Sequence, residues 1–188
     1  MRRLDPGPFV FPMPLVLVAA EFEGRPNMMP AAFLGIVNYK PTLMALGLGP
    51  GHRTAQGIEA QGVFSVSVPS RGQVIPTDWC GLNSGRTVDK ADLFNPIAGP
   101  ETGAPILQDC ALSAELRLVS TTPYSVDTCY IGEVVAVHAR EELLTPEGKP
   151  DWPAIDPLIF TFPDPAYWSL GEKIGRAWSI GKGYEPVV

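Results

Sequence analysis

The sequence contains few of the residues that metal sites and disulfide frameworks require. It has only two histidines, His52 and His138, and three cysteines, none of them in a CxxC pair. Two isolated histidines lack the ligand spacing of a metal site, and an odd number of cysteines does not make a disulfide framework. We therefore expect no metal and three reduced cysteines in a cytoplasmic protein.

Common active-site motifs are also missing. The sequence contains no GxSxG elbow, no GxxxxGK[ST] loop and no GxGxxG fingerprint. These absences argue against a hydrolase nucleophile, a Walker-type phosphate loop and a Rossmann dinucleotide site. His138 lies in an alternating stretch, which predicts a solvated or rim residue. Nothing local suggests a Cys–His or Ser–His pair, so no side-chain nucleophile is expected to carry the chemistry.

Positive charge and long apolar runs are scarce as well. Lys and Arg number 14 against 20 Asp and Glu, giving a net charge of −6. This balance argues against a nucleic-acid groove, which needs a basic surface. The N-terminal apolar stretch is interrupted by Asp5 and four prolines, and no run is long enough to cross a bilayer. A soluble, cytoplasmic protein with no nucleic-acid or membrane partner is expected.

The 188 residues suffice for one domain, which we place at 1–188, and the 21 prolines and 19 glycines are dispersed as turns would need. Short apolar or alternating runs predict the strands. They cover Leu15–Ala20, Met28–Asn38, Leu43–Leu48, Val63–Val68, Ala111–Leu118, Cys129–Ala139 and Leu158–Phe162. Short turns between the first three favour an antiparallel meander. The predicted fold class is mainly β, an antiparallel β-barrel with short helices.

The helices are expected to be short. Thr54 is a suitable cap for a helix over Ala55–Gln61, and Gly62 is a suitable stop. Further short helices are expected around Val74–Cys80 and Val88–Phe94, and Tyr167–Trp178 is expected to be a helix or turn region. In the strand Ala111–Leu118, alternation places the leucines on one face and Ser113, Glu115 and Arg117 on the other.

Two turns combine glycine, hydroxyl groups and cations. Gly49–Thr54 ends in His-Arg-Thr at an expected helix start, where free N–H groups and a guanidinium suit a dianion. Ser84–Lys90 offers two hydroxyls, Arg86 and Lys90. Each stretch is equally consistent with a plain solvated turn that precedes or caps a helix. Two such clusters in one acidic chain favour a shared anionic ligand.

A third segment could accommodate a planar ring. In Asn27–Ala32 the small Ala31 and Ala32 allow close approach to the backbone, and Met28 and Met29 are soft apolar covers. The alternative is an ordinary strand start with core methionines. Together, the three segments would suit a ligand with a planar ring at one end and a phosphate at the other. FMN is the best candidate for such a cofactor.

The order of these segments is similar to that of a known family. The relevant residues are Pro14–Val18, Gly24–Met29, Ala31–Phe33, His52–Thr54 with Ile58, Gly62–Val66, Ser84–Arg86 with Asp89–Lys90, Ile131–Val134 and Tyr167–Glu172. Over about residues 10–183 the chain resembles the flavin reductase-like family, in particular its flavoredoxin-type branch. The resemblance implies a dimeric FMN-binding split β-barrel with FMN near the subunit interface.

The resemblance also implies roles for individual residues. Those bordering the isoalloxazine would be Asn27, Met28, Met29 and Ala31, next to Ala32. Those holding the phosphate would be Arg53, Thr54, Ser84 and Lys90, with Arg86 either assisting or pairing with Asp89, and with His52 contacting or flanking it. Tyr167 and Trp168 would cover the ring or a nicotinamide pocket. The chain departs from the family at Phe33, where a Trp is common, and at His52.

The resulting functional hypothesis is a flavin-dependent oxidoreductase. A donor such as NADH or NADPH would pass a hydride to FMN, so no catalytic side chain is required. The alternatives are a flavoredoxin-like electron carrier that keeps FMN but does not oxidise NAD(P)H, and a binding module without the cofactor. Haem binding on a related barrel is disfavoured, because haem needs an axial ligand and only two histidines are present.

Overall fold

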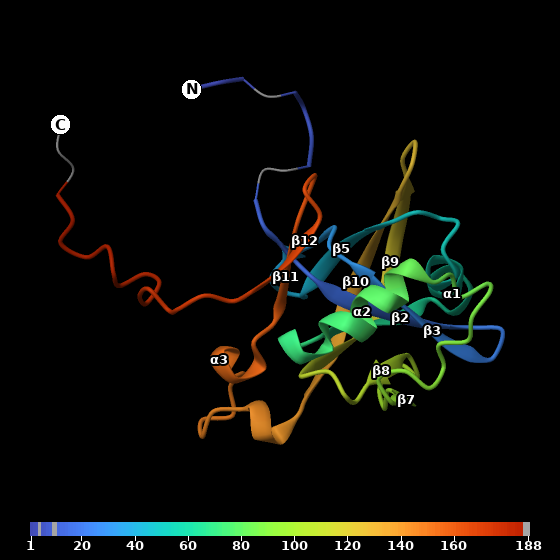
Figure 1. The fold of residues 1–188 in the computed structure, drawn as a ribbon. Helices are drawn as coiled ribbons and strands as arrows, with labels where there is room; N and C mark the ends of the chain where they lie inside the picture. Colours follow the sequence, from blue (N-terminus) through green and yellow to red (C-terminus); the bar gives the residue numbers. More distant parts are fainter. Residues whose placement is uncertain (4, 9–10, 186–188) are drawn as a thin grey trace.

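A seven-stranded antiparallel sheet forms the body of the protein. The computed structural model describes residues 1–3, 5–8 and 11–185. The strands pair in the order β3-β2-β6-β9-β10-β5-β4 (Figure 1). Their bounds are β2 Val16–Phe22, β3 Arg25–Ala31, β4 Leu34–Asn38, β5 Leu43–Leu48, β6 Val63–Val68, β9 Leu112–Pro123 and β10 Thr128–Ala139. The mainly antiparallel β class predicted from the sequence is confirmed.

Smaller elements surround this sheet. A three-stranded sheet contains β1 Met13–Pro14, β11 Leu158–Thr161 and β12 Ala166–Ser169, and a two-stranded one contains β7 Pro96–Ala98 and β8 Pro105–Leu107. The helices are α1 Arg53–Gln61, α2 Val74–Leu82 and α3 Trp152–Ile155, with 3₁₀ turns at Arg71–Gln73 and Glu141–Leu143. Within the described ranges, no helix has the length and apolar character needed to span a membrane.

The predicted return strand Met28–Asn38 is two strands, because the chain turns a corner at Ala32 and Phe33. There Leu34 N donates to Ala32 O at 2.9 Å, and Gly47 N donates to Phe33 O at 2.8 Å. The predicted meander is therefore wrong. Strand β3 pairs with β2 at one end of the sheet order, whereas β4 pairs with β5 at the other end. The continuous apolar run concealed this corner.

The same corner explains why the sheet curls. Seven flat strands would place β3 and β4 about 29 Å apart, given a spacing of about 4.8 Å. The three Cα steps from Ala31 to Leu34 span at most about 11 Å. The two end strands must therefore lie near each other, although β3 and β4 are not hydrogen-bonded neighbours in the described sheet. The result is a barrel left open between two strands, which agrees with the predicted split β-barrel.

Both faces of β2 are buried. One core cluster contains Val18, Leu46, Phe64, Leu116 and Tyr130, and α1 packs against it through Ala55 and Ile58. The second lies on the opposite face of the sheet and contains Leu17, Ala19, Met28, Cys80 and Leu107. Burial on both sides explains the unbroken apolar run in β2, and it fixes α1 and α2 against the strands that carry the candidate site.

Helix α1 begins earlier than the sequence predicts. It runs from Arg53, with His52 as the N-cap residue, so the prediction that Thr54 caps it is wrong. Thr54 is fully buried in the first turn, where its hydroxyl meets a side chain from β3 instead of a helix amide. The predicted stop is confirmed, since Gly62 adopts φ 68°, in the left-handed region that glycine tolerates best.

Other local predictions had mixed outcomes. The helix expected at Val74–Cys80 is present as α2, whereas Val88–Phe94 forms turns and not a helix. Tyr167–Trp178, expected to be a helix or turn region, opens with strand β12. Tyr167 pairs there with Phe160 on β11, and the two ring centroids lie 5.8 Å apart. This cross-strand aromatic pair accounts for extended backbone at that position.

The face of β9 expected to be polar is buried at Glu115. The side chain is 0% exposed, and the segment between β7 and β8 covers it. Thr102 donates to Glu115 Oε2 through N and Oγ1, both at 2.7 Å, and His138 Nε2 lies 2.6 Å from Oε1. His138 remains about one-third exposed, as a rim residue would be. Alternation alone could not reveal a carboxylate enclosed by a distant loop.

Candidate flavin and phosphate site

The two glycine-rich turns meet in space. Arg86 Nη2, from the second turn, donates to Gly51 O in the first at 2.9 Å. Asn27 on β3 lies beside both turns, and its Nδ2 donates to Thr54 Oγ1 at 2.7 Å in a buried hydrogen bond. Three segments that are far apart in the sequence therefore form one region of the surface.

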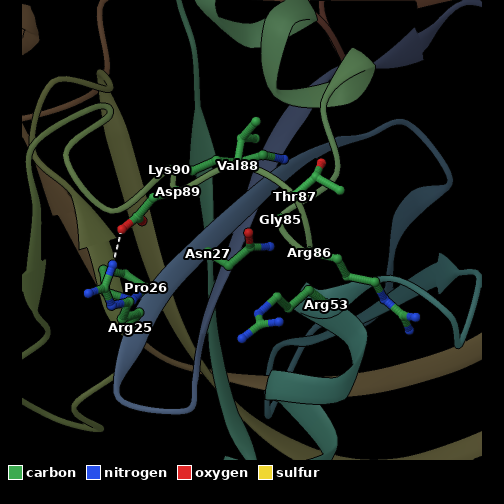
Figure 2. Close-up of a pocket in the computed structure, with 10 residues that line it drawn as sticks. All are labelled: Arg25, Pro26, Asn27, Arg53, Gly85, Arg86, Thr87, Val88, Asp89 and Lys90. Carbon is green, nitrogen blue, oxygen red and sulfur yellow. Dashed lines mark hydrogen bonds and ion pairs between the residues drawn. The ribbon is translucent and has the colours of Figure 1, made fainter.

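Two adjoining pockets open around Asn27. Pocket A, of about 240 Å³, is lined by Asn27, Met29, His52, Arg53, Thr54, Cys80, Gly81, Leu82, Asn83, Ser84, Gly85 and Lys90. Pocket B, of about 230 Å³, is lined by Arg25, Pro26, Asn27, Arg53, Gly85, Arg86, Thr87, Val88, Asp89 and Lys90 (Figure 2). Both pockets share Arg53 and Lys90, so the two cations predicted to hold one phosphate lie on the same cavity.

Lys90 is the least exposed cation of the region. It is 3% exposed, and its Nζ donates to Cys80 O at 2.6 Å and to Met28 O at 3.1 Å. A lysine ammonium has three donors, and these two carbonyls occupy two of them. Burial lowers the pKa of the Lys90 ammonium. A buried cation held against two main-chain carbonyls is costly unless it has a role, which makes Lys90 a functional candidate.

Arg53 is held at the start of α1. Its guanidinium carbon lies 4.8 Å from the centroid of the Phe22 ring, and Nη2 pairs with the Glu23 carboxylate. The cation–π contact and the ion pair restrain a side chain that is still 26% exposed. An arginine restrained beside the first amides of a nine-residue helix is well placed to bind an oxyanion.

The second turn contributes hydroxyl and main-chain groups. Ser84 Oγ accepts from Arg86 N at 3.2 Å, which folds the turn. Gly85 lies so close to Asn27 that a Cβ there would overlap the Asn27 amide. The turn can approach β3 in this way only because residue 85 has no side chain.

Asp89 pairs with Arg25 and not with Arg86. The hydrogen bond from Ala91 N and the neighbouring Arg25 guanidinium keep the pKa of the Asp89 carboxyl below its usual value. Sequence reasoning did not single out Arg25. Its place two residues before Asn27, on the strand that borders both pockets, is the signal that could have identified it.

The residues predicted to border a ring differ in whether their side chains reach the pockets. Asn27 and Met29 line pocket A. The Met28 side chain is fully buried in the second core cluster, and Ala31 is buried in the first, so each can offer only main-chain atoms; Ala32 is half-buried. Contact of these residues with a flavin stays a prediction.

The predicted ring cover lies on another element. Tyr167 and Trp168 are in β12 and are not among the described residues that line pockets A and B. Tyr167 Oη donates to Asp78 Oδ1 at 2.5 Å, which ties β12 to α2, and Trp168 Nε1 donates to Thr161 Oγ1 at 3.0 Å. Burial, together with the contact with the Asp78 carboxylate, raises the pKa of Tyr167 to about 12.

The chain is similar to known proteins along most of its length. The model of the flavin reductase like domain matches residues 9–163. Flavoredoxin from Methanosarcina acetivorans superposes with a TM-score of 0.91 at 36% identity, covering 97% of this chain and 98% of that one. Flavoredoxin of Desulfovibrio vulgaris (Miyazaki F) gives 0.90 at 32%, covering 97% and 100%. An FMN-binding protein from Thermus thermophilus, bound to 1-cyclohex-2-enone, gives 0.79 at 27%, covering 94% and 98%.

A family match over most of the chain, together with similarity to solved structures along nearly its full length, agrees with the order of motifs in the sequence. The protein belongs to the flavin reductase-like family.

Proposed function

We propose that the protein is an FMN-binding oxidoreductase in which NADH or NADPH reduces the bound flavin and the flavin reduces an acceptor. The observation that carries the proposal is the convergence of Arg53 and Lys90, from separate turns, on the same two pockets. The similarity to two flavoredoxins and to an FMN-binding protein supports the choice of a flavin, and of FMN among flavins.

The donors around the pockets fit a ribityl phosphate. Arg53 would bind two phosphate oxygens, and Lys90 would supply its third N–H. Thr54 Oγ1 already accepts from Asn27, so its own proton is available to the ligand, and Ser84, which also lines pocket A, offers a second hydroxyl. His52 and Arg86 would flank the same anion. The bound phosphate would thus replace the Glu23 carboxylate as the ion-pair partner of Arg53.

The ring would lie along β3. The main chain from Asn27 to Ala31 would pair with the polar edge of the isoalloxazine, and Met29 would cover its apolar part. Bound FMN would supply the redox chemistry by accepting a hydride at N5. The protein would orient the donor and exclude water, with Tyr167 and Trp168 as the proposed cover, so catalysis needs no side-chain base.

The alternative is an electron carrier that keeps FMN bound and does not oxidise NAD(P)H by itself. The similarity to two flavoredoxins over 97% of this chain supports this alternative. In either case we propose a cytoplasmic homodimer, in which the free edges at β3 and β4 are covered by a second subunit.

The absorption spectrum tests the proposal and separates the two functions. The purified protein should be yellow, or become so with FMN, and the colour should bleach when NADH or NADPH is added without oxygen. Colour that persists with either nucleotide yet bleaches with dithionite would identify the carrier. A colourless protein that shows no flavin binding in a titration would refute both.

Gly85→Ala tests whether the second turn must touch β3. The new methyl group would push against the Asn27 amide and break its hydrogen bond to Thr54, so FMN binding should weaken about tenfold, as the loss of one buried hydrogen bond of about 1.4 kcal/mol implies. The matched control is Gly51→Ala in the first turn, where a Cβ meets nothing within 4 Å. Equal affinities of the two variants, in a fluorescence titration, would contradict this geometry.

A further inference from the structure

A third cavity, pocket C, lies on the main sheet next to the β7–β8 hairpin. Its volume is about 330 Å³, and its lining residues come from β7, β8, β9, β10 and the loops that join them. Two of these residues, Ser113 and His138, are paired across β9 and β10. Among the described residues, none lines both pocket C and pocket A or B. Pocket C is therefore separate from the candidate flavin site.

Most of the wall of pocket C is apolar. The apolar members are Ile97, Pro100, Ile106, Leu107, Cys110 and Ala139. Burial raises the pKa of the Cys110 thiol to about 12, so this side chain stays neutral and acts as a small apolar group. Ile97 is 40% exposed, so solvent reaches the apolar wall. An apolar cavity with a few polar groups is typical of a small-molecule site.

The polar group that stands out in this wall is His138, whose ring has one nitrogen engaged and one available. His138 Nε2 lies 2.6 Å from Glu115 Oε1. Glu115 is fully buried, and although burial opposes it, hydrogen bonds from Thr102, His138 and Glu101 keep the pKa of the carboxyl below its usual value. An ionised carboxylate can only accept, so Nε2 carries the ring proton and Nδ1 of the neutral imidazole is an acceptor. No described residue is hydrogen-bonded to Nδ1.

The charges around pocket C disfavour a charged ligand. Its one arginine, Arg140, donates from Nε to Glu142 Oε1 at 2.8 Å, so the guanidinium is already paired. An anion would also lie close to the buried carboxylate of Glu115. An ammonium group would bring three donors, whereas both carboxylates already accept from the protein and His138 Nδ1 can accept only one. A neutral ligand with a single strong donor fits best.

We propose that pocket C binds a small neutral phenol. The phenolic hydroxyl donates to His138 Nδ1, and the ring lies against Ile97, Ile106 and Leu107. A phenol is favoured over an aliphatic alcohol because its hydroxyl is the more acidic and hence the stronger donor to an imidazole. Glu115 is a positioning residue, since it fixes the tautomer of His138 without touching the ligand. The inference does not rest on flavin binding, because the two sites have no described lining residue in common.

A chemical-shift titration of the isotope-labelled full-length chain tests the site, at about pH 8, where an unperturbed imidazole is neutral. Phenol should shift the amide signals of Ile97, Ile106 and Ala139, with a dissociation constant of about 1 mM for so small a ligand. Anisole keeps the ring but has no hydroxyl donor, so it should bind about tenfold more weakly. Benzoate should bind at least as weakly as anisole, and added FMN should leave the phenol titration unchanged.

His138→Phe removes the acceptor but keeps an aromatic ring in the wall. This variant should bind phenol and anisole equally, with an anisole affinity within twofold of wild type. The matched control is Val137→Ala on the same strand. Val137 is 61% exposed and lines a different cavity, so the tenfold preference for phenol should persist there.

The comparison of phenol with anisole on the wild-type chain does not depend on the folding of any variant. The proposal would be overturned if phenol left the signals of the cavity unchanged, or if anisole or benzoate bound within twofold of phenol. Competition between FMN and phenol, or a preference for phenol that survives in His138→Phe, would overturn it as well.

Discussion

Arg53→Ala is expected to weaken FMN binding roughly 30-fold, the equivalent of about 2 kcal/mol for the charge-assisted hydrogen bonds that a guanidinium makes to a phosphate. The side chain is only partly exposed and is restrained by Phe22, so little ordering is needed when the anion binds. Titration of the apoprotein with FMN, followed by quenching of flavin fluorescence, measures the change.

Arg140→Ala is the matched control. Arg140 also pairs with a nearby glutamate, Glu142, but it borders neither pocket A nor pocket B in the described structure. It therefore reproduces the loss of a surface ion pair without the loss of the proposed phosphate ligand, and its affinity should equal that of wild type. Similar FMN affinities for Arg53→Ala and wild type would show that the phosphate does not bind in this pocket.

The convergence of the two turns could be predicted from composition, but its geometry could not. Glycine, hydroxyls and cations in Gly49–Thr54 and Ser84–Lys90 indicated a shared anion, and the structure places Arg53 and Lys90 on common pockets. Nothing local showed that Lys90 is buried, because its partners Met28 O and Cys80 O come from other elements. Long-range main-chain contacts leave no mark in the sequence near the residue.

The same limit explains the errors in the fold. Strands β10 and β11 were predicted to within one residue at each end, because alternation is a local property, whereas β9 runs five residues beyond its predicted end. The corner at Ala32 and Phe33 was missed, since it depends on a hydrogen bond from Gly47 on β5. Thr54 was mistaken for a cap, since its partner Asn27 lies 27 residues earlier.

These non-local contacts also explain how one chain positions the candidate site. Asn27, Met28 and Met29 are consecutive on β3, yet they serve different surroundings. Asn27 and Met29 line pocket A, whereas the Met28 side chain anchors the strand in the core and its carbonyl holds Lys90. Because successive residues of β3 face opposite sides, packing of the Met28 side chain in the core also fixes the position of the carbonyl that holds Lys90.

Glu115→Ala should lower the free energy of unfolding by about 3 kcal/mol at neutral pH, because it leaves the donors around a buried carboxylate without an acceptor. Those donors are Thr102, through two groups, and Glu101 N, with His138 on the other oxygen. A Cβ on Gly99 would overlap the Glu115 carboxyl, so the enclosing loop packs directly on the group that the substitution removes. Urea unfolding measures the loss, and Glu147→Ala, in an exposed turn, is the control and should leave it unchanged.

The effect should also depend on pH in a defined direction. Burial by itself would raise the pKa of Glu115, but the hydrogen bonds from Thr102, His138 and Glu101 outweigh it and lower the pKa below the ordinary 4.5. A carboxyl with a lowered folded-state pKa stabilises the protein fully above its unfolded-state pKa and loses that contribution as the pH falls through the folded-state value. The difference in unfolding free energy between wild type and Glu115→Ala should therefore be constant near neutrality and shrink in acid. A difference that stays the same or grows below pH 4.5 would show that the carboxylate is not held as the structure indicates.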